Sequence, residues 1–495
     1  MSFELTERAR AHGRRVAVIE GDGEHSYQDL LEGAAAVSTA LLARRDRLDG
    51  ERVAILMPRA AWFVHALWGT WLAGGVAVPL SDLHPGPELE HVIVDSAATV
   101  VLAHPTLADR AESLAAAAGA RFVLHPATGE RLSQSRPRPA PPTGASLILY
   151  TSGSTGRPKG VVLTHANLEA QIATLVEAWE WKASDRILHV LPLHHTHGLV
   201  NALACALWAG ATCELAPRFE PAAVWQRLVT GGITLFMAVP TIYVRLLRAF
   251  AAEPAQRQAA LHDAAASLRL MVSGSAPLPE DVFQRWRDIT GQALLERYGM
   301  TEIGMALSNP LHHERRPGCV GTPLPGVEVR LVDEDGAVVS PGAAGELEVR
   351  GPGVFQEYWR RPDETRQCFR DGWFTTGDVA ILDRGAYRIL GRRSIDILKC
   401  GGYKLSALEV EAVLRTHPAV EDCAVVGLDD PDLGQQVCAA VVRKPDQPVE
   451  RDELQLYARA RLAPYKVPAR IILVRDLPRN ALGKVQKGEV ASFFE

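Results

Sequence analysis

The sequence predicts an α/β protein of two domains, and three observations lead to this fold class. The chain has 495 residues, which is too long for one ordinary hydrophobic core. Helical patterns alternate with short apolar strands over most of the length, which predicts layered α/β architecture. The last stretch, after Gly391, has its own order of helices and strands. We therefore expect a large N-terminal domain over residues 1–391 and a small, mobile α+β C-terminal domain over residues 392–495.

The first part of the large domain reads as successive β–α units. Residues 30–130 alternate helical patterns with apolar runs such as Val53–Leu56 and Val76–Val78. A proline-rich polar stretch, residues 133–146, follows as a surface connection to the apolar strand Leu147–Tyr150.

A second α/β stretch begins near residue 185, and from Gly326 to Gly351 the pattern changes to alternating strands. The alternation predicts a small β-rich subdomain within the N-terminal domain. We expect strands at residues 187–190, 234–237, 327–332, 346–350, 422–426 and 437–442, and helices at 221–228 and 408–414.

Composition excludes several classes of partner. Hydrophobic residues make up 47% of the chain, as in a globular protein, and the net charge of −5 gives no basic footprint for nucleic acid. The most apolar run, Val200 to Ala211, contains Asn201 and Gly210, so we expect a buried helix and no membrane contact.

The ends and the cysteines indicate a cytoplasmic location. Arginines near the N-terminus are mixed with Glu4 and Glu7 and no apolar segment follows, so neither a secretory signal nor a transit peptide is expected. The seven cysteines are scattered without a CxxC pair, which favours reduced thiols over disulfides or a zinc site.

The most informative motif follows the strand at Leu147. Small hydroxyl residues and glycines let backbone and side-chain donors converge on phosphate oxygens, and a lysine adds a positive charge. The loop lacks the Gly-Lys-Ser/Thr ending of a Walker A motif, and a plain flexible turn is the alternative interpretation. Its residues are Thr151, Ser152, Gly153, Ser154, Thr155, Gly156 and Lys159.

Five further motifs follow in a fixed order: SGSAPL at 273–278, ERYGMTE at 296–302, WFTTGD at 373–378, a glycine-rich segment within 391–404, and PRNALGK at 478–484. Together with the phosphate loop they resemble the adenylate-forming (acyl-activating) superfamily over nearly the whole chain. Residues 191–198, 236–243 and the turn at Ser273 are most similar to malonyl-CoA synthetases.

The resemblance implies a two-step ligation with ATP, Mg²⁺ and coenzyme A. A substrate carboxylate attacks the α-phosphorus of ATP, and the thiol of coenzyme A then displaces AMP from the acyl-adenylate. The implied catalytic residues are Lys484, Thr301, Glu302 and His195. A lysine suits the first step because it offsets the repulsion between carboxylate and phosphate.

The resemblance also assigns binding residues. The ATP site would comprise the loop residues above with Gly274, Ser275, Ala276, Glu296, Arg297, Tyr298, Gly299, Met300, Thr301, Asp378, Arg392, Arg393 and Lys484. Mg²⁺ would be held by Thr155 and Glu302, and coenzyme A would contact Lys399, Gly401, Gly402 and Tyr403. A tight turn is an equal interpretation for the two glycines.

A malonate-type acid keeps one carboxylate charged inside the acyl pocket, and burying it without a partner is very costly. Arg245, five residues after Pro240, is our candidate clamp, while a solvent-facing helix arginine is the alternative. The other expected substrate residues are His195, His197, Asn201, Ser273, Ser275 and Met305. The spacing of His194, His195 and His197 could also suggest a metal, which we consider the weaker interpretation.

Ligation of malonate, with methylmalonate as an open alternative, is the function favoured by the sequence, and the partners expected are small molecules. A medium-chain or aryl acyl-CoA synthetase would instead leave Arg245 facing solvent. A peptide-synthetase adenylation domain usually has a pocket aspartate, and residues 191–200 contain none. A non-catalytic nucleotide-binding protein is the fourth hypothesis.

Overall fold

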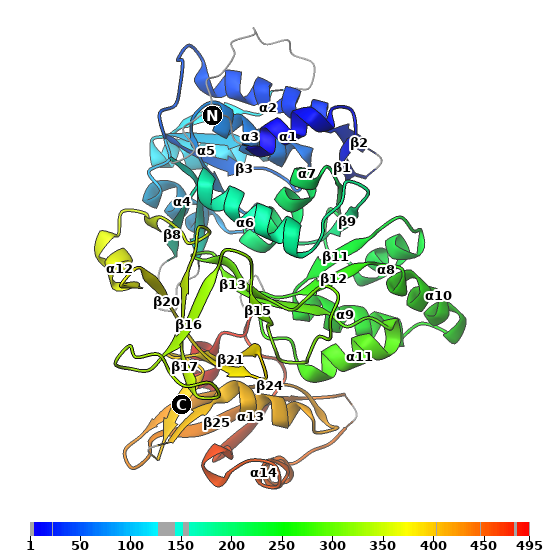
Figure 1. The fold of residues 1–495 in the computed structure, drawn as a ribbon, viewed down its shortest axis with the longest axis vertical. Coiled ribbons are helices and arrows are strands. Elements are labelled where there is room, and N and C mark those ends of the chain that lie inside the picture. Colours follow the sequence, from blue (N-terminus) through cyan, green and yellow to red (C-terminus); the bar gives the residue numbers. More distant parts are fainter. Residues whose placement is uncertain are drawn as a thin grey trace.

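The computed structural model of the chain describes residues 4–21, 23–126, 144–151, 158–401, 403–445, 447–479 and 483–494. Figure 1 shows the N-terminal layers at the top, a small sheet on the left and the C-terminal domain at the bottom. The predicted class, a large layered α/β domain with a β-rich part and a small α+β domain, is confirmed. The boundary after residue 391 stays a prediction, and strand β21 (Ala386–Arg392) crosses it by one residue.

The first α/β sheet carries the strand that precedes the phosphate loop. Its order is β18-β8-β7-β4-β3-β5-β6, and the strands from β7 to β6 are parallel. These central strands are short apolar runs with helices packed beside them, as expected for parallel strands buried on both faces. The strands are β3 (Arg52–Leu56), β4 (Val76–Pro79), β5 (Val100–Ala103), β6 (Arg121–Leu124), β7 (Ala145–Thr151), β8 (Lys159–Thr164) and β18 (Glu357–Tyr358). The helices between them are α3 (Ala61–Leu72), α4 (Gly86–Asp95), η1 (Pro105–Leu107) and α5 (Ala108–Ala118).

The second α/β sheet has the order β15-β14-β13-β12-β11-β9-β10-β1-β2. Strands β1 and β2 come from the start of the chain and join it through a parallel pairing of β1 with β10. The strands are β1 (Val16–Glu20), β2 (Gly23–Ser26), β9 (Arg186–His189), β10 (Thr212–Leu215), β11 (Leu235–Ala238), β12 (Leu270–Ser273), β13 (Leu295–Met300), β14 (Gly304–Ser308) and β15 (Thr322–Pro323). The helices are α1 (Glu4–His12), α2 (Tyr27–Leu42), α6 (His165–Ala178), α8 (Pro221–Val229), α9 (Pro240–Ala251), α10 (Ala255–Ala266) and α11 (Glu280–Thr290).

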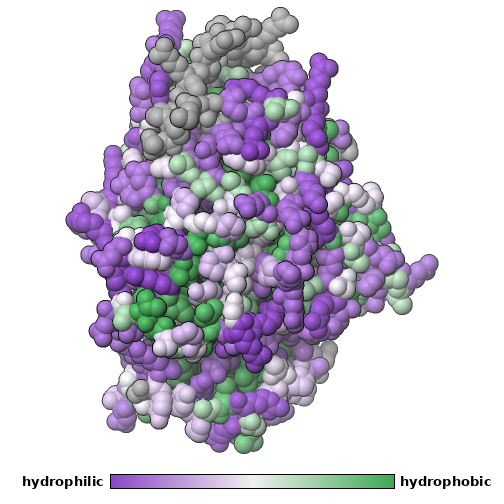
Figure 2. All heavy atoms as spheres, viewed as in Figure 1, coloured by the Kyte–Doolittle hydropathy of each residue, from purple (hydrophilic) through white to green (hydrophobic). Residues whose placement is uncertain are grey.

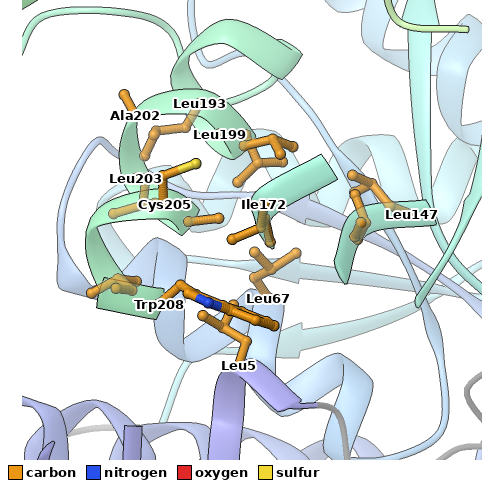
Figure 3. Close-up of a cluster of buried hydrophobic side chains, with 14 of the residues drawn as sticks. Leu5, Leu67, Leu147, Ile172, Leu193, Leu199, Ala202, Leu203, Cys205 and Trp208 are labelled. Atoms are coloured by element: carbon orange, nitrogen blue, oxygen red, sulfur yellow. The ribbon is translucent and has the colours of Figure 1, made fainter. Parts of the chain in front are cut away.

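A buried hydrophobic cluster joins these layers (Figure 3). Leu67 of α3, Ile172 of α6 and Leu199 belong to it, with Leu147 of the phosphate-loop strand at one side. The buried helix expected near residues 200–211 is confirmed as a π-helix, η2 (His197–Ala204), continued by α7 (Cys205–Ala209). Within the described part of the chain, no helix combines the length and apolar character needed to cross a bilayer.

The third sheet forms the predicted β-rich subdomain, with β16 (Glu328–Val332), β17 (Ala344–Arg350), β19 (Phe369–Arg370), β20 (Trp373–Asp383) and β21, beside helix α12 (Pro362–Gln367). On the face drawn in Figure 2, hydrophilic side chains cover most of the surface and hydrophobic ones form smaller patches between them.

The C-terminal domain packs its helices around a sheet of β22 (Ile397–Cys400), β23 (Tyr403–Ser406), β24 (Val420–Asp430), β25 (Gly434–Arg443) and β26 (Arg470–Val474). Its helices are α13 (Ala407–Arg415), α14 (Arg451–Arg459), η3 (Pro464–Lys466), α15 (Lys487–Ala491) and η4 (Ser492–Phe494). Val410, Val425 and Val441 lie in a core separate from that of the large domain, so the domain has its own apolar centre.

Candidate active site

The expected site residues converge at the carboxyl ends of β11, β12 and β13. These strands are parallel, with Ala238 opposite Ser273 and Ser273 opposite Glu296. In open α/β sheets, ligands bind at this edge of the strands. This pairing brings together the motifs at 273–278 and 296–302, which are separated by 17 residues in the sequence.

A buried guanidinium is the main charged group at this edge. Arg297 is 3% exposed, and its Nη2 lies 3.3 Å from the Oγ of Ser275. Among the described residues it forms no ion pair with a carboxylate, and its Nε has no hydrogen-bond partner. Burial lowers the pKa of Arg297 to about 9, so the side chain is positively charged at neutral pH.

Local backbone geometry makes room for this guanidinium. A Cβ at Gly274 would lie 2.5 Å from the Arg297 Cζ, so a larger residue there would displace the arginine. Ser275 has a φ of 69°, an uncommon conformation for a residue with a side chain, and strained residues of this kind cluster at functional sites. Ser275 is exposed, in contrast to the buried Arg297 that it contacts.

Histidine 197 contacts the same serine. Its Nδ1 lies 3.2 Å from the Oγ of Ser275, and its Nε2 has no partner in the described part of the chain. Burial lowers its pKa well below the usual range and lowers that of His195 to about 4. Both imidazoles are therefore neutral at pH 7, which leaves Arg297 as the positive charge beside Ser275.

Three other expected substrate residues, Ser273, Asn201 and Met305, are buried. Ser273 and Asn201 are fully buried, and each has a side-chain polar atom without a partner among the described residues. Asn201 accepts a hydrogen bond from Gln171 of α6 at 3.1 Å. Met305 packs against Gly299, since a Cβ there would lie 2.4 Å from the Met305 Cε. Buried polar atoms without partners are rare, so this cluster fits a polar ligand.

Arg245 does not have the burial that a clamp requires. It lies on the exposed side of α9, with its guanidinium 4.8 Å from the centre of the Phe219 ring. The expectation of a buried Arg245 is therefore wrong for this conformation, because the buried side of α9 is formed by Tyr243, Leu246 and Leu247. A contact of Arg245 with substrate stays a prediction.

The nucleotide residues form a second group. Tyr298 donates a hydrogen bond of 2.6 Å from its hydroxyl to Asp378, and the Nε of Arg392 donates one of 3.1 Å to the same carboxylate. Arg393 instead contacts Glu346 of the small sheet, so Arg392 is the arginine that reaches Asp378. A carboxylate has about four acceptor positions, which leaves Asp378 able to accept further hydroxyl donors.

Glu302 lies between this group and the phosphate loop. Its carboxylate accepts a 2.9 Å hydrogen bond from the Tyr358 hydroxyl, and the Nζ of Lys159 lies 5.4 Å from the Tyr358 ring. Burial raises the pKa of Glu302, while Arg392 and Lys159 lower it. Thr301 adjoins Glu302 in the turn between β13 and β14.

The phosphate loop itself is described only at its ends. Thr151 and Lys159 face each other in the antiparallel pair of β7 and β8, and Lys159 also contacts Glu364. The predicted loop residues Ser152, Gly153, Ser154, Thr155 and Gly156 lie outside the described residues, as does Gly402.

The two C-terminal motifs touch different parts of the large domain. Gly483, next to Lys484, lies against α9, since a Cβ there would be 3.1 Å from the Thr241 Oγ1. Lys404, in the other motif, pairs with Glu334 at 2.6 Å. Lys484 is exposed in this arrangement.

The segment expected to bind coenzyme A forms the β22–β23 hairpin. The turn interpretation of Gly401 is confirmed, because this glycine has a φ of 57° between the two strands. Lys399 and Tyr403 are exposed, and the Tyr403 ring stacks on that of Tyr465 at 4.4 Å. The contact of these residues with coenzyme A stays a prediction.

The metal interpretation of the three histidines has no support from the described residues, which contain no group of three or more His, Cys, Asp or Glu suited to a metal ion. The structure adds two residues that the sequence did not indicate, Tyr358 and Gln171. Their contacts are long-range, and no local pattern marks them.

The fold and the order of the site motifs agree with the comparisons to known protein families. A model of the AMP-binding enzyme family matches residues 5–359, and one of the AMP-binding enzyme C-terminal domain matches residues 409–484. The chain belongs to the AMP-binding enzyme family.

Two relatives and one solved structure are similar to this chain over nearly its whole length. The chain is 45% identical to malonate–CoA ligase ACSF3, mitochondrial, of Homo sapiens, over 100% of this chain and 92% of that protein. It is 43% identical to malonate–CoA ligase of Arabidopsis thaliana, over 97% of this chain and 86% of that protein. ATP-bound MatB from Rhodopseudomonas palustris is 35% identical, with a TM-score of 0.92 over 100% and 99% of the two chains.

The apo form of the same MatB gives a lower TM-score, 0.82. The arrangement of the present chain is thus more similar to the ATP-bound form of that protein.

A buried carboxyl at the site predicts how stability depends on pH. Burial raises the pKa of Glu296 to about 8, so the folded protein holds this proton more tightly than the unfolded chain does. The resulting stabilisation is present at low pH and is lost as pH rises from about 5 through 8, by up to about 1.4 kcal/mol per pH unit. Glu296→Gln should remove this part of the pH dependence.

The measurement is the free energy of unfolding of both proteins at several pH values across that range. Glu90→Gln, at an exposed position, is the control and should keep the original pH dependence. Equal curves for the Glu296→Gln variant and the unchanged protein would contradict the prediction.

Proposed function

We propose that the chain ligates malonate to coenzyme A with ATP, through malonyl-adenylate, and releases AMP and pyrophosphate. The observation that carries the proposal is the buried, positively charged Arg297 beside Ser275 and His197, without a carboxylate partner among the described residues. A buried charge without a partner is unfavourable, and a carboxylate ligand offsets that cost. The similarity to malonate–CoA ligases of human and plant origin supports the same substrate.

In the first step, a carboxylate oxygen of malonate would attack the α-phosphorus of ATP, and pyrophosphate would leave with the electrons of the broken P–O bond. Lys484 would approach from the C-terminal domain, where Gly483 docks on the start of α9. Its ammonium group would offset the repulsion between the two anions in the transition state. Tyr298 would stack on the adenine, and Asp378 would accept hydrogen bonds from the ribose hydroxyls.

In the second step, the thiolate of coenzyme A would attack the acyl carbon, and AMP would leave. The β22–β23 hairpin, with Lys399, Gly401 and Tyr403, would have to face the acyl-adenylate for this step. The C-terminal domain would therefore rotate between steps, about the segment from Arg392 to Asp396, where β21 ends and the small domain begins.

Magnesium would accompany the nucleotide. Mg²⁺ is commonly held by one or two carboxylates together with phosphate oxygens, and Glu302, near Lys159 and Arg392, offers an oxygen ligand in that position. The metal would neutralise phosphate charge when bound.

We also propose that the protein is located in the cytoplasm. All seven cysteines are free in the structure, which suits a reducing compartment such as the cytoplasm. The name of the human relative places that protein in mitochondria.

The choice of acid gives the first test of the proposal. With ATP and Mg²⁺ supplied, pyrophosphate release should be faster with malonate or methylmalonate than with acetate, butyrate or benzoate. The physical reason is that only a second carboxylate meets the buried guanidinium. Faster release with any of the monocarboxylates would contradict the assignment of malonate.

Two arginine variants separate the candidate clamps. Arg297→Met should lower kcat/KM for malonate, with a loss of transition-state binding of roughly 2–5 kcal/mol. The reason is that the malonate carboxylate that does not react loses its partner. Activity with butyrate should fall much less, because butyrate has no second carboxylate. Arg245→Ala, which removes an exposed guanidinium, should have a small effect on malonate.

The readout is the ratio of kcat/KM for malonate to that for butyrate, since general damage to the site lowers both values and leaves the ratio unchanged. An unchanged ratio in Arg297→Met with a large loss in Arg245→Ala would move the clamp to α9.

A further inference from the structure

One arginine holds the backbone directly before Lys484. The backbone of Arg479 pairs with that of Val485 across the loop, and the Arg479 Nη1 donates a 2.7 Å hydrogen bond to the carbonyl oxygen of Gly483. Gly483 has a φ of 76°, so the backbone turns sharply directly before the lysine. Arg479 thus contacts the peptide group from which Lys484 extends.

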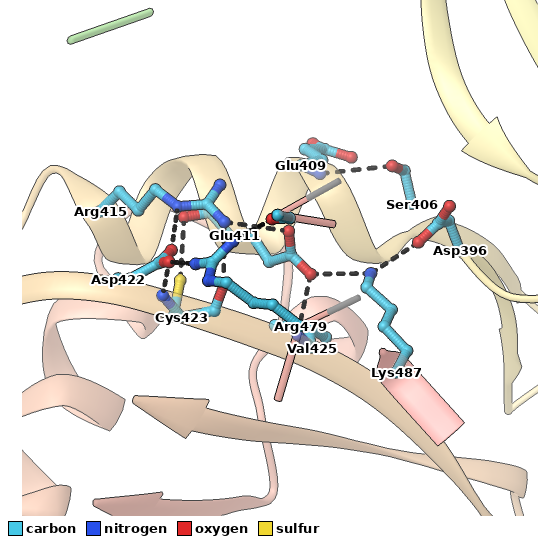
Figure 4. A network of polar contacts seen from close by, with 11 residues as sticks. Asp396, Ser406, Glu409, Glu411, Arg415, Asp422, Cys423, Val425, Arg479 and Lys487 are labelled. Atoms are coloured by element: carbon cyan, nitrogen blue, oxygen red, sulfur yellow. Dashed lines mark hydrogen bonds and ion pairs between the residues drawn. The ribbon is translucent and has the colours of Figure 1, made fainter. Parts of the chain in front are cut away.

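The same guanidinium is held from the other side by Asp422 on β24. Asp422 also accepts a 3.1 Å hydrogen bond from the Nε of Arg415, and a 2.8 Å hydrogen bond from the backbone N–H of Cys423. Figure 4 shows Arg479 and Arg415 converging on this carboxylate. The Asp422 carboxylate therefore has a fixed position, which orients the fork of Arg479 toward Gly483.

From Arg415 the polar network continues toward the segment that joins the domains. Arg415 contacts Glu411 at 3.3 Å, and the Nζ of Lys487 lies 2.7 Å from Glu411 and 2.6 Å from Asp396. The other oxygen of Asp396 accepts a 3.0 Å hydrogen bond from the backbone N–H of Arg392. Arg479 and Asp396 of the interdomain segment are thereby parts of one polar network (Figure 4).

Two residues of this region touch the large domain on one face of α9. Gly483 lies against Thr241, and Glu421, which precedes Asp422, contacts Arg248. Thr241 and Arg248 are seven positions apart, which places them on the same face of a helix. Asp422 and Arg479 therefore connect the contact of Gly483 with α9 to the contact of Glu421 with α9.

We propose that Arg479 is a positioning residue for the adenylation step, acting through Lys484. It holds the carbonyl of Gly483 and the carboxylate of Asp422 at once, so that docking of β24 on α9 aims the lysine at the reacting groups. This inference rests on the proposed function, because it assigns Arg479 to the step in which Lys484 acts. The planar fork of an arginine presents donors to these two acceptors in a fixed geometry, whereas a lysine has a single ammonium group on a flexible stem.

The test compares Arg479→Met in the two half-reactions. Acid-dependent exchange of pyrophosphate into ATP reports adenylation, and transfer from supplied acyl-adenylate to coenzyme A reports thioester formation. Adenylation should slow roughly 10- to 100-fold, the scale of a misplaced catalytic group. The KM for ATP and the rate of thioester formation should change less than about threefold.

A double-mutant cycle with Lys484→Ala distinguishes positioning from general damage. If Arg479 acts through Lys484, Arg479→Met should have little further effect on adenylation in the Lys484→Ala background. Arg470→Met is the matched control. The Nη2 of Arg470 also donates a hydrogen bond to a backbone carbonyl, that of Phe494 at 2.8 Å, which is not part of the network around Asp422. This variant should leave both half-reactions unchanged.

Equal losses in both half-reactions, or fully additive losses in the double variant, would overturn the proposal. If the acid panel identifies an acid other than malonate, the cycle is run with that acid. A failed substrate assignment and a failed role for Arg479 therefore give different results.

Discussion

The site depends on the cost of burying the guanidinium of Arg297. A charged side chain removed from water is unfavourable unless an opposite charge or several hydrogen-bond partners meet it. In the described part of the chain, Arg297 has the hydroxyl of Ser275 as its hydrogen-bond acceptor and no carboxylate within ion-pair distance. The neighbouring histidines are neutral because burial lowers their pKa values, so this edge of the sheet has a net positive charge suited to an anion.

The rest of the architecture brings the other candidate site residues to this edge of the sheet from several directions. The parallel strands β12 and β13 place Ser275 and Arg297 side by side, and the small β-rich sheet supplies Asp378. The C-terminal domain adds the Lys484 loop, which docks beside the start of α9. In the proposed two-step reaction, rotation of the C-terminal domain would exchange the catalytic groups while the acyl-adenylate stays enclosed.

Much of this was predictable from the sequence because the signals are local. Runs of three to six mostly apolar residues identified the strands β3, β4, β9, β11 and β25, and the ordered motifs identified Tyr298, Asp378 and Arg392, which the structure brings into contact. Tyr298 lies in β13, Asp378 in β20 and Arg392 at the end of β21.

Other features depend on non-local contacts and were not predictable in the same way. The pairing of β1 with β10 joins residues nearly two hundred positions apart, and no periodicity in either strand specifies that partner. Arg245 is different, because its sequence did hold a signal: it shares a helical face with Thr241 and Arg248, opposite the apolar Tyr243 and Leu246. The choice of Arg245 as a buried clamp overlooked that periodicity.

A crystal structure with a non-hydrolysable analogue of malonyl-adenylate tests the central claim most directly. The account predicts that the far carboxylate lies within hydrogen-bond distance of the guanidinium of Arg297 and the hydroxyl of Ser275. A far carboxylate that meets only apolar side chains, or only the guanidinium of Arg245, would contradict it.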